Sequence, residues 1–300
     1  MTATDLHWPA LPLDAWEPTR ATLHMWTQIV GKIRLALSPY VNHWWQVPLY
    51  VSPRGLTTSP IPCDGESFEI LFDFIDHALL IQKSDGAVRR LELAPRSVAD
   101  FHAEVMALLR GLGIAVKIWP VPVEIADPIP FAQDRIHAAY DPDYANRFWR
   151  ILVSIDAVLK KFRGGFIGKC SPVHFFWGSF DLAVTRFSGR RAPLRPDADP
   201  ITREAYSHEV ASVGWWPGDA VVKGPAFYAY GAPAPEGYAN WAVKPAAAHY
   251  HQGLSEFVLG YDDLRQAPSP RQALLDFCQS TYEAAAVLGK WDREELERGG

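Results

Sequence analysis

The chain has 300 residues, of which 48% are hydrophobic and 21% charged, and this composition excludes a disordered chain and a coiled coil. Its 29 Lys and Arg residues are outnumbered by 34 Asp and Glu, and the formal charge of −5 argues against binding to nucleic-acid phosphates. With 12 Trp, 11 Tyr and 15 Phe the chain is rich in aromatic side chains, and its 25 Pro favour loops and edge strands over a helical bundle.

The first 119 residues predict two helices separated by antiparallel strands. Apolar residues recur every three or four positions over residues 19–37, which predicts a helix that Pro39 ends. A second helix is predicted to begin after Ser97, a good cap, and to end before Gly111. Asp85-Gly86 between two alternating runs predicts a hairpin. The predicted strands cover residues 46–52, 56–61, 67–74, 77–83, 88–93 and 115–119.

A proline-rich stretch at residues 120–130 predicts a semi-rigid connector, after which the pattern of helix, strands and helix starts again. Helices are predicted at residues 142–162 and 270–288. The predicted strands of this second part cover residues 174–187, 206–216, 226–230 and 256–261.

The order of elements predicts an α+β fold built from two similar halves, each an antiparallel sheet covered by helices. We expect residues 1–119 to form the first half, residues 120–130 the connector and residues 131–300 the second half, packed as one compact unit. An internal duplication is one explanation, because segments 98–113 and 274–289 align without a gap and both end in Leu-Gly. Chance similarity between two amphipathic helices is the alternative.

Cysteine usage and the terminal sequence predict a cytoplasmic protein. Cys63, Cys170 and Cys278 are odd in number and far apart, which predicts neither a disulfide framework nor a zinc site of CxxC type. The first 20 residues lack the basic and apolar regions of a secretory signal, and no apolar run approaches the ~18 residues of a membrane span. We therefore expect no membrane association.

Two short motifs resemble ligand sites without matching them. Residues 163–170 (RGGFIGKC) place Arg163 where a phosphate loop needs glycine and Cys170 where it needs Ser or Thr. His249 and His251 lie two residues apart, so on a strand both could face one metal ion together with Glu256. Exposed loop histidines are the other reading, and we predict neither a metal nor a cofactor.

The predicted strand at residues 174–187 carries the richest set of polar and aromatic side chains. As one continuous strand it would place Trp177, Ser179 and Asp181 on a face with an aromatic rim and a polar centre. The opposite face would hold His174 and Arg186 at the two ends of an apolar row. An aromatic rim around hydroxyl and carboxyl groups is typical of a cleft for a polar ligand, whereas a face covered by a helix is the alternative.

The matching strand of the first half adds a second row, namely Trp44, Tyr50 and Arg54, which would lie across a groove from the first if the halves pack as pseudo-twofold partners. His208 and Glu209 are neighbours on a strand and therefore point to opposite faces. A histidine with a carboxylate in that groove would be a general base, and Arg54 or Arg186 would bind an anionic group.

Six segments are distinctive enough to indicate a family. They are QIVGKIRLA (28–36), NHWW (42–45), RGLTT (54–58), SPVHFFWGSFDLAVTRFSG (171–189), YSHEV (206–210) and STYEAAA (280–286). Together they resemble an uncharacterised bacterial family of unknown function, and the resemblance extends from Leu11 to Trp291. It implies a bacterial, single-chain, cytoplasmic protein and assigns no catalytic residue.

Three kinds of function fit these observations. The first is a metal-independent hydrolase or transferase whose catalytic residues come from His174, Asp181, His208 and Glu209. The second is a non-catalytic module that binds a small anionic or ring-bearing ligand through Trp44, Tyr50, Arg54, Trp177, Ser179 and Arg186. The third is a homodimeric scaffold. We expect a small-molecule ligand, no nucleic-acid or membrane partner, and a monomer or a homodimer.

Overall fold

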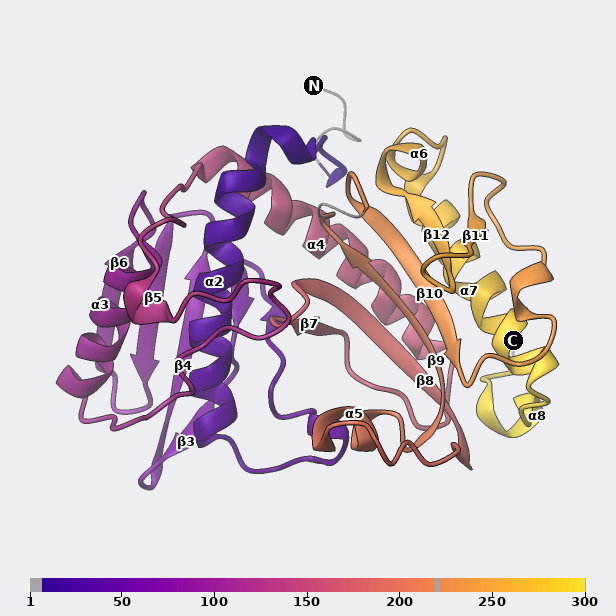
Figure 1. Cartoon of the computed structure of the whole chain (residues 1–300), viewed down its shortest axis with the longest axis horizontal. Helices are drawn as coiled ribbons and strands as arrows, with labels where there is room; N and C mark the ends of the chain where they lie inside the picture. The colour runs from indigo at the N-terminus through magenta and orange to yellow at the C-terminus, as the bar shows by residue number, and fades with distance from the viewer. Residues whose placement is uncertain (1–6, 219–221, 300) are drawn as a thin grey trace.

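The computed structural model describes residues 7–218 and 222–299 and contains two six-stranded antiparallel sheets, each packed against helices. Figure 1 shows the first sheet with α3 on one side of the molecule, the second sheet with α7 on the other, and α2 crossing the middle. The predicted α+β fold with two halves is therefore confirmed.

The first sheet is a meander with one additional short strand. Its strands follow the order β1-β2-β4-β5-β6, and β3 pairs with β4. The hairpin predicted at Asp85-Gly86 joins β5 to β6, where Gly86 has a φ of 91° that favours glycine. The strands are β1 (Tyr50–Val51), β2 (Gly55–Thr57), β3 (Ile61–Cys63), β4 (Glu66–Asp73), β5 (Ala78–Lys83) and β6 (Val88–Glu92).

Helices α2 (Leu13–Leu37) and α3 (Val98–Gly111) cover one face of the first sheet. The Ser97 side chain accepts a hydrogen bond from the Asp100 backbone N–H, which caps α3 as the sequence predicts. Trp26 of α2 stacks on Phe101 of α3 at 4.5 Å between ring centroids, and Phe101 in turn stacks on Phe72 of β4. These rings join the two helices to the sheet in one core.

The second sheet has the order β11-β12-β10-β9-β8-β7, so β11 lies at the edge beyond β12. Its strands are β7 (His174–Phe176), β8 (Asp181–Arg191), β9 (His208–Trp216), β10 (Ala226–Ala232), β11 (His249–His251) and β12 (Glu256–Gly260). Helices α4 (Pro142–Gly164) and α7 (Pro270–Leu288) cover one face of this sheet. The shorter helices are α5 (Pro200–Ala205), α6 (Tyr261–Arg265) and α8 (Arg293–Leu296), with 3-10 turns η1 (Asn42–Trp44), η2 (Phe131–Gln133) and η3 (Tyr238–Asn240).

The two halves share one hydrophobic core. Leu49 and Phe175 exchange backbone hydrogen bonds of 2.9 Å in both directions, which links the segment before β1 to β7. Phe148 of α4 contacts Trp16 of α2 at 5.4 Å and Trp215 of β9 at 6.0 Å between ring centroids. Burial of these large rings supplies much of the free energy that holds the halves together.

Four predicted strands differ from the structure. Residues 115–119 form no strand. The strand predicted at residues 46–52 begins only at Tyr50, because residues 42–46 form η1 and a turn. The strand predicted at residues 56–61 is interrupted at residues 58–60, between β2 and β3. The strand predicted at residues 174–187 is broken by a four-residue turn at 177–180, and β7 folds back on β8 as a hairpin. Gly178 and Ser179 are turn-forming residues, and Phe180 adopts a φ of 62° there. The strand orders of the two sheets differ, and the duplication stays a prediction.

No helix in the described part of the chain combines the length and the apolar content needed to span a membrane.

Candidate functional site

A cavity of about 680 Å³ opens on the face of the second sheet that α4 and α7 leave uncovered. The strand register explains which side chains form its floor. Thr185 of β8 lies opposite Ser212 of β9, and Ser212 lies opposite Tyr230 of β10. Two positions further along each strand, Ala183 of β8 lies opposite Gly214 of β9, and Gly214 lies opposite Tyr228 of β10. Leu182 and Val184 point the other way, since side chains alternate along a strand.

The walls of the cavity come from segments far apart in sequence. Trp44 and Trp45 of the η1 turn form one side, α5 contributes Thr202 and Ala205, and the connector contributes Val123 and Glu124. Aromatic residues line much of this surface, namely Trp44, Trp45, Phe176, Trp177, Phe187, Tyr206, Tyr228 and Tyr230.

Helix α2 positions two of these walls. The Gln28 side-chain amide exchanges two hydrogen bonds of 2.8 Å with the backbone of Val123, which fixes the connector. The His24 imidazole bonds the Gly178 carbonyl at 2.7 Å, and burial lowers the pKa of His24 to about 4, so the ring is neutral and donates. Trp177 packs flat against Gly31, where any side chain would overlap the indole ring, and donates from Nε1 to the Val47 carbonyl at 2.8 Å. The cavity wall is therefore rigidly tied to α2.

Asp181 is the buried carboxyl group of the cavity. It is 6% exposed and accepts hydrogen bonds from the hydroxyl of Ser179 at 2.5 Å and from that of Tyr228. Burial raises the pKa of Asp181, because the charged form loses its water, while the two hydroxyl donors partly oppose the shift. Among the described residues no Lys, Arg or His forms an ion pair with it. The carboxyl group is thus held in place and left without a counter-ion.

The rest of the floor is a layer of paired hydroxyl groups. Thr185 and Ser212 hydroxyls lie 2.9 Å apart, and the Tyr206 and Tyr230 hydroxyls lie 2.8 Å apart. Burial raises the pKa of Tyr230, so this phenol is neutral throughout the physiological range. Such groups both donate and accept, and they can bond to a polar ligand.

Four of the predicted site residues line this cavity, namely Trp44, Trp177, Ser179 and Asp181. The other six lie elsewhere.

Tyr50 and His174 lie together in the interface between the halves. His174 is fully buried, and its Nε2 lies 3.4 Å from the Tyr50 hydroxyl while Nδ1 has no partner among the described residues. Burial and the nearby Arg34 lower the pKa of His174 to about 3, so the ring is neutral. β7 and β8 form a hairpin in which His174 lies opposite Ala183, so these two side chains point to the same face of the sheet. One continuous strand would instead have placed His174 on the face of Arg186.

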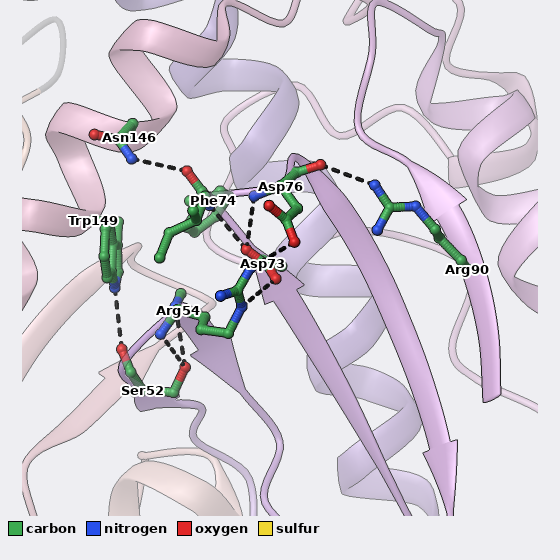
Figure 2. Close-up of polar contacts among 10 residues, drawn as sticks. Ser52, Arg54, Asp73, Phe74, Asp76, Arg90, Asn146 and Trp149 are labelled. Carbon is green, nitrogen blue, oxygen red and sulfur yellow. Dashed lines mark hydrogen bonds and ion pairs between the residues drawn. The ribbon is translucent and has the colours of Figure 1, made fainter. Parts of the chain in front are cut away.

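Arg54 is occupied by carboxylates at the end of the first sheet. Its Nε bonds Asp73 at 2.5 Å and its Nη2 bonds Asp76 at 2.6 Å, as Figure 2 shows. Asn146 and Trp149 of α4 bond the backbone of the neighbouring residues Phe74 and Ser52, also drawn in Figure 2. This cluster joins α4 to the first sheet, which is a structural role.

Arg186 lies on the covered face of the second sheet. It is 2% exposed, and its guanidinium lies over the rings of Phe162 at 3.5 Å and Tyr282 at 4.3 Å, measured to the ring centroids. It also donates to the Phe162 carbonyl. Arg186 therefore packs beneath α4 and α7 and does not reach the cavity.

His208 and Glu209 point to opposite sides of β9, as the alternation predicts. His208 lies beside His43 at 5.8 Å between ring centroids, and its Nδ1 lies 3.0 Å from the Ser207 hydroxyl. Glu209 pairs with Arg190 at 2.6 Å. Neither residue contacts Asp181, so the predicted histidine–carboxylate pairs are not brought together among the described residues.

No group of three or more His, Cys, Asp and Glu side chains within residues 7–218 and 222–299 has the arrangement of a metal site. His249 and His251 are exposed on β11, where His251 lies opposite Glu256. The Nδ1 atom of His251 accepts a hydrogen bond from the Leu254 backbone N–H.

Sequence reasoning missed Lys32, Glu124, Tyr228 and Tyr230 as cavity residues. The two tyrosines alternate along a predicted strand and so share a face, which is a signal that could have been used. Lys32 is a buried charged residue in an otherwise largely apolar run of α2, as is Arg34 two positions later. Only the packing of α2 against the second half brings Lys32 and Glu124 to this cavity.

A family model for a family of unknown function, DUF5996, matches residues 8–298. The chain belongs to DUF5996. No curated protein and no solved structure matches it. The sequence-based prediction of a family of unknown function is therefore confirmed.

The DUF5996 match includes every element from α2 to α8, and thus both sheets and all the walls of the cavity. Membership in DUF5996 assigns no activity, so the function has to be argued from the cavity itself.

Proposed function

We propose that this member of DUF5996 binds a small ring-bearing molecule in the cavity on the open face of the second sheet. The observation that carries this proposal is the environment of Asp181. A carboxyl group that is 6% exposed, held by two hydroxyl groups and surrounded by aromatic walls has no counter-ion in the described residues. Burying such a group costs free energy that a bound ligand can offset.

The size and lining of the cavity support a small organic ligand. A volume of about 680 Å³ falls within the range of roughly 300–1,000 Å³ that is typical of small-molecule pockets. The partly exposed rings of Trp44 and Trp45 offer flat apolar surfaces for stacking, while the hydroxyl pairs of the floor fix the orientation of the ligand.

A binding protein fits the arrangement better than a hydrolase or transferase that uses a histidine base. Among the described residues that line the cavity, no histidine nitrogen is hydrogen bonded to a carboxylate. His43, which lines it, bonds the Glu204 carbonyl at 3.0 Å through Nδ1 and lies 2.5 Å from the Lys169 ammonium through Nε2. Lys169 donates to that nitrogen, so His43 is already engaged on both sides.

The test is a screen of ring-bearing metabolites and fragments by ligand-observed NMR, with a variant that fills the cavity. Ala205 is half-buried at the end of α5 and lines the cavity, so Ala205→Trp places an indole inside it. Ala103 is exposed on α3, and Ala103→Trp is the matched control. Thr202→Trp on α5 serves as a second filling variant.

We expect ligands that bind the wild-type protein and Ala103→Trp equally and bind Ala205→Trp at least about tenfold more weakly. A screen without a single ligand would contradict the proposal. Ligands that bind both filling variants as tightly as the wild type would also contradict it, because they would lie outside the cavity.

A cytoplasmic location is a further part of this proposal. The three cysteines are all free, and Cys278 is fully buried on α7. Free buried thiols are typical of proteins that fold in a reducing compartment.

A further inference from the structure

Charged groups of both signs line the cavity, and its ammonium, Lys32, forms no ion pair with its carboxyl group Asp181. We infer that the ligand is a ring-bearing zwitterion whose anionic group binds Lys32 and whose ammonium group binds Asp181, with the two charges at opposite ends of the ring. This inference rests on the proposed function and names the class of ligand for the same cavity.

Lys32 supplies the anion-binding end. It is 4% exposed, lines the cavity from α2, and forms neither a hydrogen bond nor an ion pair with any described residue. Its ammonium lies 5.6 Å from the ring centroid of Trp177, which is its one polar or cation–π contact among those residues. A partly desolvated ammonium without a counter-ion is costly, and a carboxylate on the ligand would pair with it.

The titration of Lys32 agrees with this role. Burial lowers the pKa of Lys32 to about 8, so the amine is still largely protonated at neutral pH. No neighbouring charge contributes to that shift, whereas a paired carboxylate would raise the pKa. No carboxylate oxygen of the described residues lies within ion-pair distance of the Lys32 ammonium, so neither Asp181 nor Glu124 pairs with it directly.

Asp181 supplies the cation-binding end. Glu124 on the connector and Glu256 on β12 lie close enough that the charge of Asp181 adds to the effect of burial in raising the pKa of both. The pKa of Glu256 rises to about 7. None of these three carboxyl groups has an ion-pair partner in the described part of the chain. An ammonium placed here would be attracted by all three and would lie beside the rings of Tyr228 and Tyr230.

The experiment compares four probes that share a benzene ring, by isothermal titration calorimetry at pH 7. They are 4-(aminomethyl)benzoate with both charges at opposite ends, 4-methylbenzylamine with the ammonium alone, 4-methylbenzoate with the carboxylate alone, and L-phenylalanine with both charges on one carbon. Two variants remove one protein charge each, namely Lys32→Met and Asp181→Asn. The exposed residues Lys117 and Asp64 provide the matched controls Lys117→Met and Asp64→Asn.

We expect 4-(aminomethyl)benzoate to bind the wild type about tenfold to a hundredfold more tightly than each of the other three probes, as a charge-assisted hydrogen bond predicts. Lys32→Met should reduce its affinity to that of 4-methylbenzylamine and leave 4-methylbenzylamine unaffected. Asp181→Asn should reduce it to that of 4-methylbenzoate, and the two controls should change nothing.

Equal affinity for the singly charged probes, or for L-phenylalanine, would overturn the inference on the wild-type protein alone. If none of the charged probes binds while uncharged ring compounds bind in the cavity-filling test, the zwitterion is wrong and the binding function stands. If nothing binds the wild type in either experiment, both are wrong.

Discussion

The close packing of Trp177 on Gly31 leads to a prediction in which helix propensity and packing oppose each other. Gly31 lies inside α2, where replacing glycine by alanine ordinarily stabilises a helix by about 1 kcal/mol. Here a methyl group would overlap the Cδ1, Nε1 and Cδ2 atoms of the Trp177 indole. The ring cannot move aside freely, because it is 7% exposed and its Nε1 donates to the Val47 carbonyl at 2.8 Å.

The magnitude follows from these opposing effects. Overpacking a core costs about 1–3 kcal/mol, and loss of the indole hydrogen bond adds about 0.5–1.5 kcal/mol. After the gain in helix propensity is subtracted, Gly31→Ala should lower the free energy of unfolding by about 1–3 kcal/mol. Gly111 ends α3 with no atom within 4 Å of an added Cβ, so Gly111→Ala should be neutral or slightly stabilising.

Urea denaturation followed by far-UV circular dichroism measures both variants, and a double-mutant cycle with Trp177→Leu assigns the cause. Removing the indole should make Gly31→Ala at least about 1 kcal/mol less harmful than it is in the wild type. The reasoning is refuted if Gly31→Ala stabilises the wild-type chain, or if the cycle shows no coupling between the two positions.

Three further predictions concern groups that the structure places outside the cavity. The pKa of His174 is about 3 in the folded chain and about 6.5 when unfolded. Its neutral ring therefore contributes fully to the free energy of unfolding above pH 6.5. That contribution is lost as the pH falls toward 3, and about 2 kcal/mol of it is lost at pH 5. His174→Asn should remove that part of the difference in unfolding free energy between pH 7 and pH 5, and an unchanged difference in this variant would contradict the assignment. Arg186→Lys should lower the free energy of unfolding by about 1–3 kcal/mol, because lysine cannot stack a planar group on Phe162, and a variant as stable as the wild type would count against this packing role. Arg54→Ala should change the stability little at neutral pH, because the pair with Asp73 is half-exposed, and the pKa of Asp73, followed by NMR, should rise. A pKa that stays low would show that the backbone N–H groups of Ile75 and Asp76 alone hold it down.

Part of the site was predictable because it is local in the sequence. Trp177, Ser179 and Asp181 lie within five residues, and all three line the same cavity. The alternation along β8 also holds, since Asp181 and Thr185 face the cavity while Val184 and Arg186 face α4 and α7. The prediction of one continuous strand was wrong, because Gly178 and Ser179 form a turn that moves His174 to the other face of the sheet.

Arg54, Arg186 and the histidines show why residue type alone does not define a site. Arg54 is paired with two aspartates, Arg186 is covered by rings, and His174 is buried between the halves. Each is a residue that can do chemistry, and each has partners that are distant in the chain. Those partners depend on how the helices dock on the sheets, and periodicity carries no information about that docking.

By itself the sequence determined the four long helices, most of the strands and the hairpin at Asp85-Gly86, because propensity, capping and turn chemistry act over a few neighbouring residues. Its distinctive segments also indicated the family. The tertiary structure decided which face of the second sheet stays open and which charges meet there. Lys32 and Asp181 are 149 positions apart in the chain and share one cavity only because α2 of the first half packs against the second. Burial then lowers the pKa of Lys32 and raises the pKa of Asp181, and no local sequence pattern encodes these shifts.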